Sequence, residues 1–553
     1  MKINNVKKIY KYILSAGIVL SAKITNAQTL SIVSDINPGN GSSIPFSFSV
    51  MNNKLYFAAD DGSNGTELWK SDGTAGGTVL VKDINVGGLS SFPIENTAFG
   101  SSNYFQASDG IAGTELWKSD GTAAGTILIK DINVGIIGSS SPSGFKGLGS
   151  NVYFIANDGI NGTELWKTDG TASGTVLVKD INVGSGSSSP SGFTIMGSNI
   201  YFLADDGVNG AELWKTDGTL VGTVMVKDIN TGVAGSFPDN FLVLGANIYF
   251  RAIDVINGAE LWKTDGTTIG TILVKDIYSG TSGSGPSEMK VFGSNIIFSA
   301  NDGNYGTEVW KSDGTAAGTV LVKDINVGLS LFSSNPVGFT VLGSNIYFNA
   351  YDGGVYGTEL WKSDGTTAGT MLVKDIKSGA NSSFPSGFKV LGSNIYFSAN
   401  DGVNGEELWT TDGTALGTSL VGDINSGLSD SNPSNFNVMG GTLYFSAFNL
   451  ANGGELWKYT PSTAGVLNFD VENKKIVIFP NPSTGVFNLV YDSESNSLVT
   501  LQILNVSGQI VMSQTLNADG AKNLIDLSGF AKGLYLIKTE QSGQVSTRRI
   551  IVE

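Results

Sequence analysis

The chain contains no cysteine and no histidine among its 553 residues. The first absence excludes disulfide bonds and thiol nucleophiles. The second excludes histidine metal sites, Ser–His catalysis and the usual protonation switch near neutral pH. Any chemistry would therefore depend on Asp, Glu, Tyr, Lys, Arg or a metal held by oxygen ligands.

Basic residues are also scarce, with 33 Lys and Arg against 49 Asp and Glu and a formal net charge of −16. Binding to a phosphate backbone needs clustered positive charge, so nucleic acid is not an expected partner. An apolar share of 41% excludes a disordered chain, and 74 glycines fit many short strands joined by tight turns.

Long apolar runs are limited to the beginning of the chain, where the basic segment MKINNVKKIYKY precedes ILSAGIVLSA and a few small residues. This order predicts a signal peptide over residues 1–27, cleaved between Ala27 and Gln28. The run is short for a membrane span, and no later stretch is long enough. The mature chain is therefore expected to leave the cytoplasm without a transmembrane segment.

All nine tryptophans belong to one repeated segment, which reads GTELWKSDGTAAGT at residues 113–126. They stand at positions 69, 117, 166, 214, 262, 310, 361, 409 and 457, so the period is 48 to 51 residues. Self-similarity at this period predicts a propeller or a solenoid. The longest spacing results from insertions within residues 326–339 and 352–359, where Gly, Ser and Asn indicate loops around a fixed framework.

Residues 191–230 show the content of one unit. The pieces FTIMG, NIYFLA, AELWK and TVMVKDI are short, rich in β-branched and aromatic residues, and bounded by turn residues. No piece of useful length has helical periodicity. Four short strands joined by hairpins predict a propeller blade, with a β-solenoid as the alternative.

The two ends of the repeat region complement each other. The fourth strand of a unit is expected to be outermost, because a long Ser- and Pro-rich connection such as residues 182–192 follows it. Residues 29–36, TLSIVSDI, read as a fourth strand without a unit, and the unit around Trp457 lacks one. We predict that this strand closes a ring of nine blades and removes two open edges, although propellers typically have four to eight blades. An open or two-part arrangement is the alternative.

The repeated residues favour a structural role. Sheets of a propeller are covered on both faces, and burial of each indole contributes on the order of 2–3 kcal/mol. A platform for stacking sugars is the functional alternative for the tryptophans. The SDG segments are predicted to be turns. The Glu of ELW, as in Glu115 or Glu164, is predicted to accept backbone N–H groups or to pair with a lysine such as Lys130 or Lys179.

A metal site is considered at the segment from Asn157 to Glu164, which places several oxygen ligands within eight residues. Calcium prefers such ligands, but the spacing lacks the EF-hand pattern and local turn chemistry also explains it. No cofactor and no metal-binding residue is predicted, and calcium stays open as an alternative.

A functional site is expected where one unit departs from the rule that the others follow. The departures form no paired carboxylates and no nucleophile–base pair, so no catalytic, cofactor-binding or metal residue is assigned. They are Arg251, Val255, Tyr305, Phe332, Tyr356, Thr410 and Gly422.

With these motifs, the units resemble the ELWxxDGT-repeat family of bacterial surface proteins over about residues 29–460. Three units depart from the motif, at Val309, at Thr410, and after Trp457, where KYT follows. The resemblance implies a surface protein and no particular chemistry. The propeller is accordingly assigned to residues 28–460 and a linker to residues 461–475.

Residues 476–553 change in character, because FNLVY, VTLQIL and LYLIK alternate apolar and polar residues and predict a small Ig-like β-sandwich. This segment resembles the type A C-terminal sorting domain of type IX secretion substrates; an ordinary Ig-like adhesion module is the alternative. The resemblance implies a Bacteroidota-type host, the type IX secretion machinery as partner, and secretion or display at the outer-membrane surface. The residues that carry it are Phe479, Pro480, Asn481, Pro482, Gly485, Phe487, Leu489, Asn505, Gly508, Gln509, Gly533, Tyr535, Ile537, Lys538, Arg548 and Arg549.

Three functions are compatible with these features. The preferred hypothesis is a secreted or surface-displayed propeller that binds or adheres to a glycan or another surface ligand, with no evident catalytic chemistry. The second is a polysaccharide-active enzyme, a glycosidase or a lyase, with carboxylate or Tyr catalysts in the central channel. The third is a structural surface coat.

Overall fold

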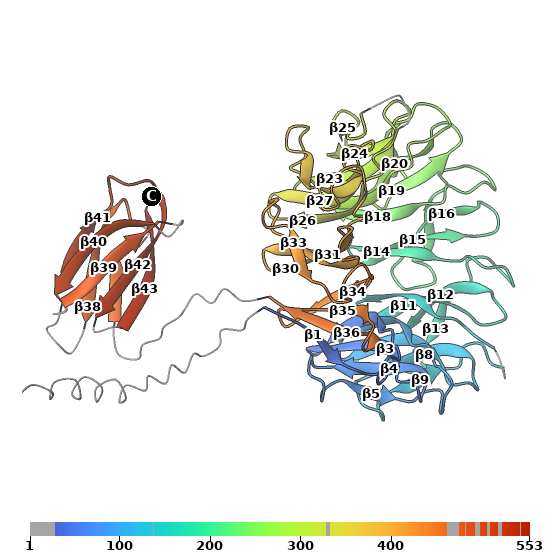
Figure 1. Cartoon of the computed structure of the whole chain (residues 1–553). Coiled ribbons are helices and arrows are strands. Elements are labelled where there is room, and N and C mark those ends of the chain that lie inside the picture. Colours follow the sequence, from blue (N-terminus) through green and yellow to red (C-terminus); the bar gives the residue numbers. More distant parts are fainter. Residues whose placement is uncertain are drawn as a thin grey trace, which may run out of the picture. The chain divides into compact units, whose positions relative to one another are not determined.

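The computed structural model describes residues 28–135, 138–327, 332–461, 475–481, 483–492, 498–505, 509–517, 522–541 and 544–552. The predicted signal peptide, residues 1–27, and residues 462–474 of the predicted linker lie outside the described residues. The described chain forms two compact units, Gln28–Pro461 and the strands that follow Lys475 (Figure 1).

The first unit is a β-propeller of nine four-stranded antiparallel sheets. The inner strands are β2 (Phe46–Met51), β6 (Ile94–Phe99), β10 (Ser143–Leu148), β14 (Ser191–Met196), β18 (Asp239–Leu244), β22 (Ser287–Phe292), β26 (Val337–Leu342), β30 (Ser386–Leu391) and β34 (Ser434–Met439). The second strands are β3 (Lys54–Asp60), β7 (Ser102–Ser108), β11 (Asn151–Asn157), β15 (Asn199–Asp205), β19 (Asn247–Asp254), β23 (Asn295–Asn301), β27 (Asn345–Tyr351), β31 (Asn394–Asn400) and β35 (Thr442–Asn449).

The third strands carry the tryptophans: β4 (Thr66–Ser71), β8 (Thr114–Ser119), β12 (Thr163–Thr168), β16 (Ala211–Thr216), β20 (Gly258–Thr264), β24 (Thr307–Ser312), β28 (Thr358–Ser363), β32 (Glu406–Thr411) and β36 (Gly453–Thr460). The outer strands are β5 (Val79–Lys82), β9 (Ile127–Lys130), β13 (Val176–Lys179), β17 (Val224–Lys227), β21 (Ile272–Lys275), β25 (Val320–Lys323), β29 (Met371–Lys374), β33 (Ser419–Gly422) and, for the last blade, β1 (Thr29–Ser34). Blades are numbered 1 to 9 in the order of their inner strands.

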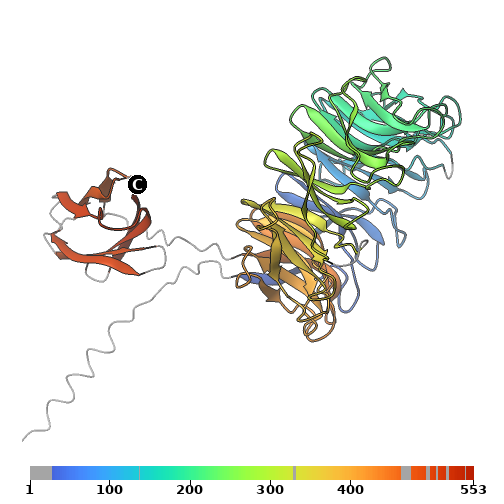
Figure 2. The ribbon, with the colours of Figure 1, turned by 90° about the horizontal axis from the view of Figure 1, so that it is seen from above.

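The ring is closed by its first strand. β1 pairs with β36 from Thr29 opposite Thr460 to Ser34 opposite Leu456. Figures 1 and 2 show this blue strand within the orange last blade. Each inner strand lies beside the inner strand of the next blade, and β34 lies beside β2. The predictions of nine blades and of closure by residues 29–36 are confirmed, and the solenoid and open alternatives are wrong.

Tryptophan packs where two blades meet. Trp166 lies opposite Phe154 in its own sheet, and the nine tryptophans are only 5% to 9% exposed. Between blades 3 and 4, one apolar cluster joins Tyr153 and Leu165 to Phe202 and Trp214. The indole N–H groups have no hydrogen-bond partner among the described residues, so the rings contribute through packing. The predicted packing role is confirmed, and buried rings cannot form a sugar-stacking platform.

Two lysines from each regular blade hold the next blade. Lys167 of blade 3 donates to the carbonyl oxygen of Gly218 in the DGT turn of blade 4 (2.8 Å). Lys179 donates to the carbonyl oxygen of Thr223 (2.8 Å), and its ammonium lies 5.5 Å from the centroid of the Trp214 ring. A cation over an indole face is attracted by the ring quadrupole. Consecutive blades are therefore joined by polar contacts as well as by apolar packing.

The second unit is a β-sandwich. One sheet has the order β37 (Lys475–Phe479), β38 (Val486–Asp492), β41 (Lys522–Asp526). The other has the order β40 (Ile510–Asn517), β39 (Leu498–Leu504), β42 (Gly533–Gln541), β43 (Gln544–Val552). Alternate residues of these strands, among them Phe487, Leu501 and Ile537, are fully buried between the sheets. The predicted sandwich is confirmed.

Candidate ligand-binding site

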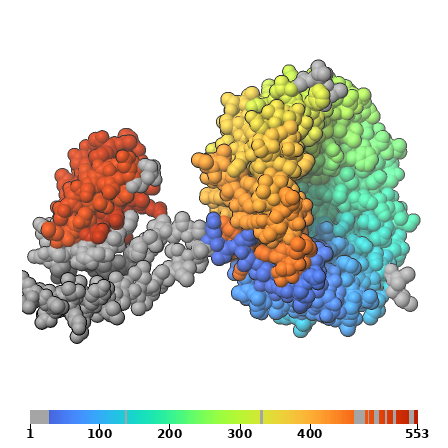
Figure 3. Space-filling view, in the orientation of Figure 1, coloured from blue at the N-terminus to red at the C-terminus, as the bar shows by residue number. Residues whose placement is uncertain are grey.

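The inner strands surround the centre of the ring, where Figure 3 shows the molecule hollowed. The second residue of each inner strand has a left-handed backbone at a β-bulge. Its φ is +56° at Glu288, +77° at Gly338 and +68° at Gly387, and the bulge of β30 lies between Ser386 and Lys389. We call these nine positions the channel ring: Ser47, Glu95, Gly144, Gly192, Asn240, Glu288, Gly338, Gly387 and Asn435.

A cavity of about 830 Å³ opens along the channel ring between blades 5 and 9. It is lined by residues of β18, β22, β26, β30 and β34, together with Asn349 of β27 and Pro385, which precedes β30. The lining residues are Asn240, Phe241, Glu288, Met289, Lys290, Val337, Gly338, Phe339, Thr340, Asn349, Pro385, Ser386, Gly387, Phe388, Lys389, Asn435 and Phe436. The volume lies within the roughly 300–1,000 Å³ that is typical of ligand pockets.

Charged groups in the cavity are few and differ between blades. Glu288 accepts a hydrogen bond from the backbone N–H of Gly338 (2.9 Å). Lys290 and Lys389 have no hydrogen bond or ion pair with any described residue. Glu288 is also the one acidic side chain among the described lining residues. The cavity therefore presents two unpaired ammonium groups beside one occupied carboxylate.

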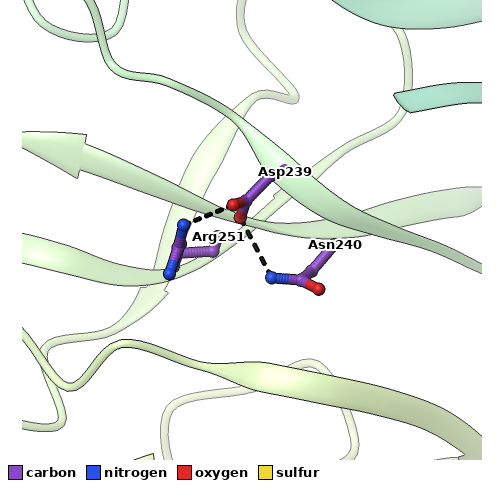
Figure 4. A network of polar contacts seen from close by, with 3 residues as sticks. All are labelled: Asp239, Asn240 and Arg251. Carbon is purple, nitrogen blue, oxygen red and sulfur yellow. Dashed lines mark hydrogen bonds and ion pairs between the residues drawn. The ribbon is translucent and has the colours of Figure 1, made fainter. Parts of the chain in front are cut away.

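Arg251, one of the departures, has its own counter-ion. It lies opposite Asp239 in the β18–β19 ladder and forms an ion pair with it, and Asn240 donates to the other carboxylate oxygen of Asp239 (3.1 Å; Figure 4). Asp239 stands where five other blades have Ser. Sequence reasoning missed Asp239, although a second exception in the same unit was the available signal. Arg251 is therefore not a free cation.

The departures at Val255, Tyr305, Phe332 and Tyr356 lie in loops and are 40% to 68% exposed. These loops join second to third strands or lead into the next inner strand. In an antiparallel blade both kinds of loop lie at the edge where the inner strands begin, which is also where the cavity opens. Unit-specific side chains of blades 5 to 7 thus share a face of the propeller with the cavity.

Thr410 and Gly422 are explained by the architecture instead. The lysines that occupy these positions elsewhere donate to the DGTxxGT segment of the following blade, and blade 9 has no such segment. Tyr396 and Tyr459 fill this junction with rings 5.2 Å apart. A Cβ on Gly422 would collide with the side chain of Leu30 in β1. These two departures therefore adapt blade 8 to the closing blade and mark no site.

A second cavity, of about 480 Å³, lies between blades 6 and 7 at the other ends of the inner strands. It includes Ile297, which stands where each of the other eight blades has Tyr. In a regular blade this tyrosine reaches the DGT glycine of the next blade, as Tyr249 does at Gly314. The space results from a shortened side chain, which Phe292 fills only in part.

The glutamates of ELW are completely buried. Glu164 accepts hydrogen bonds from the N–H groups of Ile181 (3.0 Å) and Ser188 (2.8 Å) and from the Ser188 hydroxyl (2.5 Å). The prediction of backbone donors is confirmed. The lysine alternative is wrong, because Lys130 and Lys179 reach the next blade.

Burial raises the pKa of all nine of these carboxyl groups, and for Glu308 and Glu359 to about 7, although the hydrogen bonds lower it in part. A raised pKa can mark a functional site. Here the same buried glutamate recurs in each blade. Its hydrogen bonds connect the end of the outer strand with the loop that follows, so its role is structural.

The oxygen-rich segment at Asn157 uses its oxygens locally. Asp158 accepts the N–H groups of Ile160 (2.9 Å) and Asn161 (2.7 Å), while Glu164 is bound elsewhere. Among the described residues no group of three or more acidic side chains could hold a metal ion. Single carboxylate oxygens are buried without a described partner at Asp83, Asp131, Asp180, Asp228, Asp276, Asp324 and Asp375.

In the sandwich, the residues that carry the sorting-domain resemblance hold the chain end. Asn481 accepts the N–H of Ile551 (3.0 Å) and donates to the carbonyl oxygen of Arg549 (2.9 Å). Tyr535 donates its hydroxyl to the carbonyl oxygen of Ala531 (2.6 Å). Pro482 and Gly508 lie outside the described residues.

Residues 477–553 match the family model of the "Secretion system C-terminal sorting domain". The match confirms the sorting domain of type IX secretion, and with it a secreted or surface-located protein that engages this machinery. No helix in the described part of the chain has the length and apolarity to cross a membrane.

No curated protein matches the chain. Among solved structures, a puromycin hydrolase is 13% identical with a TM-score of 0.33, over 69% of this chain and 61% of that one. The prolyl oligopeptidase B of Galerina marginata is 10% identical with a TM-score of 0.37, over 75% and 56%. The chain thus spans less than two thirds of these structures, and likeness at this level carries no functional argument.

Proposed function

We propose that this protein is an exported propeller that binds a glycan or a similar surface ligand in the cavity between blades 5 and 9. The observation that carries the proposal is the contrast between scaffold and cavity. Tryptophans, buried glutamates and turns repeat around the ring, whereas the cavity combines Glu288, Lys290, Lys389 and Asn435 from different blades. Unit-specific side chains that converge on one concave region are typical of a binding site on a repetitive scaffold.

Catalysis by the cavity has less support. Glycoside hydrolysis usually needs two carboxyl groups on either side of the scissile bond. Among the described residues that line the cavity, Glu288 is the one acid, and it already accepts the N–H of Gly338. A polysaccharide-active enzyme would need a second acid, and a coat protein would need no cavity of this kind.

The export route completes the proposal. The sorting domain would deliver the propeller through the type IX machinery, after cleavage of the signal peptide near Ala27. The resemblance of the repeats to those of bacterial surface proteins agrees with binding outside the cell.

The test is binding of the full-length protein to a panel of polysaccharides, together with an assay for their hydrolysis. Ser386→Trp should abolish binding, because Ser386 is an exposed cavity residue and an indole there would fill the entrance. Ser191→Trp is the matched control, since Ser191 is the exposed first residue of β14 and does not line the cavity. Equal loss with both variants, or turnover of a polysaccharide, would contradict a pure binding role.

A further inference from the structure

The channel ring contains an internal precedent for carboxylate binding. The carboxylate of Glu288 accepts the N–H of Gly338, the ring residue of the next blade (2.9 Å). The carboxylate of Glu95 approaches the N–H of Gly144 in the same way (3.3 Å). Two glutamates at equivalent positions thus each place a carboxylate on the backbone amide of the following blade.

The next two pairs of neighbouring positions in the channel ring, Gly338 with Gly387 and Gly387 with Asn435, lack this carboxylate. Gly338 and Gly387 have no side chain, so neither can offer an oxygen to the N–H of Gly387 or of Asn435. A Cβ on Gly387 would approach the Phe436 ring to 2.7 Å, so glycine at this position lets the phenylalanine of the next blade pack against the backbone. Gly387 and Asn435 both line the cavity.

Two lysines contribute positive charge to the same cavity. Lys290 and Lys389 line the same cavity, and no described residue pairs with either of them. The chain as a whole carries a net charge of −16, so the two ammonium groups make this cavity locally more positive than the average surface. Because charge-assisted hydrogen bonds are about twice as strong as neutral ones, a ligand carboxylate would gain most from this position.

The remaining lining residues suit a saccharide better than a peptide. Thr340, Ser386 and Asn240 offer hydroxyl and amide groups, and Phe388 offers a ring. Hydroxyl-rich sugars use such convergent polar groups beside aromatic faces.

We infer that the cavity selects acidic polysaccharides and places a uronate carboxylate between Lys290 and Lys389, near the N–H groups of Gly387 and Asn435. This inference rests on the proposed binding function and specifies its ligand class. Glu288 would then disfavour the ligand by charge repulsion, while it holds the N–H of Gly338.

The experiment measures binding of the full-length protein to polygalacturonate and to its fully methyl-esterified form, which has the same backbone without charge. The acidic polymer should bind at least about tenfold more tightly, as expected for a charge-assisted contact. Lys290→Gln and Lys389→Gln should each weaken it about five- to tenfold, and Glu288→Gln should strengthen it. Lys146→Gln, at the same register on β10 but outside the cavity lining, should have no effect.

The outcomes separate this inference from the proposed function. Equal binding of both polymers, or indifference to both lysine variants, would overturn the carboxylate site and leave glycan binding intact. Tighter binding of poly-glutamate than of polygalacturonate would overturn the glycan class. Failure of Ser386→Trp to affect any bound glycan, or the absence of glycan binding altogether, would overturn the proposed function itself. Circular dichroism of the variants confirms that each is folded.

Discussion

If β1 closes the ring, truncation of two equivalent isoleucines should reduce the free energy of unfolding by equal amounts. Ile36 follows β1 and Ile181 follows β13 at the same point of the repeat. Ile36 is 6% exposed and Ile181 is 4% exposed. The N–H of each donates to its ELW glutamate at 3.0 Å, Glu455 and Glu164 respectively.

Replacement by alanine keeps the N–H and removes only buried carbon atoms. Truncation of a buried isoleucine typically costs about 2–5 kcal/mol. Ile181→Ala should therefore destabilise the propeller by this amount. Ile36→Ala should match it to within about 1 kcal/mol, since the two sites are equally buried and the variability of such substitutions is of that order.

The assay is denaturant unfolding of the full-length protein, followed by tryptophan fluorescence. All nine tryptophans lie in the propeller and none in the sorting domain, so the signal reports the ring alone. If Ile36→Ala leaves the unfolding midpoint unchanged while Ile181→Ala lowers it, β1 does not hold the ring closed in solution.

Four further outcomes are expected. In the folded protein the pKa values of Glu308 and Glu359 are raised to about 7, above their values in the unfolded chain, so the native state binds more protons. The urea midpoint of unfolding should therefore rise as the pH falls from 7.5 to 5. A midpoint that does not change with pH would contradict protonation of these groups. Trp214→Phe should cost about 1–2 kcal/mol and Trp214→Ala about 3–5 kcal/mol, because the indole N–H has no described partner; equal costs would indicate a missed hydrogen bond. Deletion of residues 476–553 should retain the protein inside the cell envelope, as fractionation with an antibody would show, whereas normal export would refute the sorting role. Chelators should leave the melting temperature unchanged, because Asp158 is satisfied by N–H donors, and a large decrease would restore the calcium alternative.

The repeat made most of the propeller predictable. A period of 48 residues, strands bounded by turn residues and an unmatched fourth strand at residues 29–36 together led to nine blades and a closed ring. Packing of the tryptophans followed from the two-sided burial of propeller sheets. These features depend on local pattern and topology, which a single sequence contains.

Contacts between blades are harder to predict, because the lysine contacts of consecutive blades join residues 44 to 54 positions apart. The sequence offers Lys179 as a partner of a glutamate, yet its ammonium reaches Thr223 and Trp214 of the next blade. The cavity was missed for a related reason. Its residues vary between blades, and the left-handed channel ring contains Glu and Asn as well as the glycines that would normally indicate such a backbone.

The departures showed both the value and the limit of comparing units. Sequence comparison marks Thr410 and Gly422 as candidates for a site, but both replace lysines whose acceptor, the DGTxxGT segment of the next blade, is absent from blade 9. Ile297 and Asp239, which shape a cavity and a charge pair, were not singled out. The role of a residue that differs from the repeat becomes clear only when its contacts with the neighbouring blade are considered.

The lysines that donate hydrogen bonds to the following blade also determine which joint between blades is the weakest. The joint between blades 8 and 9 lacks both cations, at Thr410 and Gly422, and the joint between blades 9 and 1 lacks one, at Ser34, while Lys458 still reaches Gly73 (2.8 Å). A propeller with identical contacts at every joint would have no preferred place at which to open. This propeller is expected to open first on either side of blade 9, where lysine contacts are missing, while the seven regular joints stay intact.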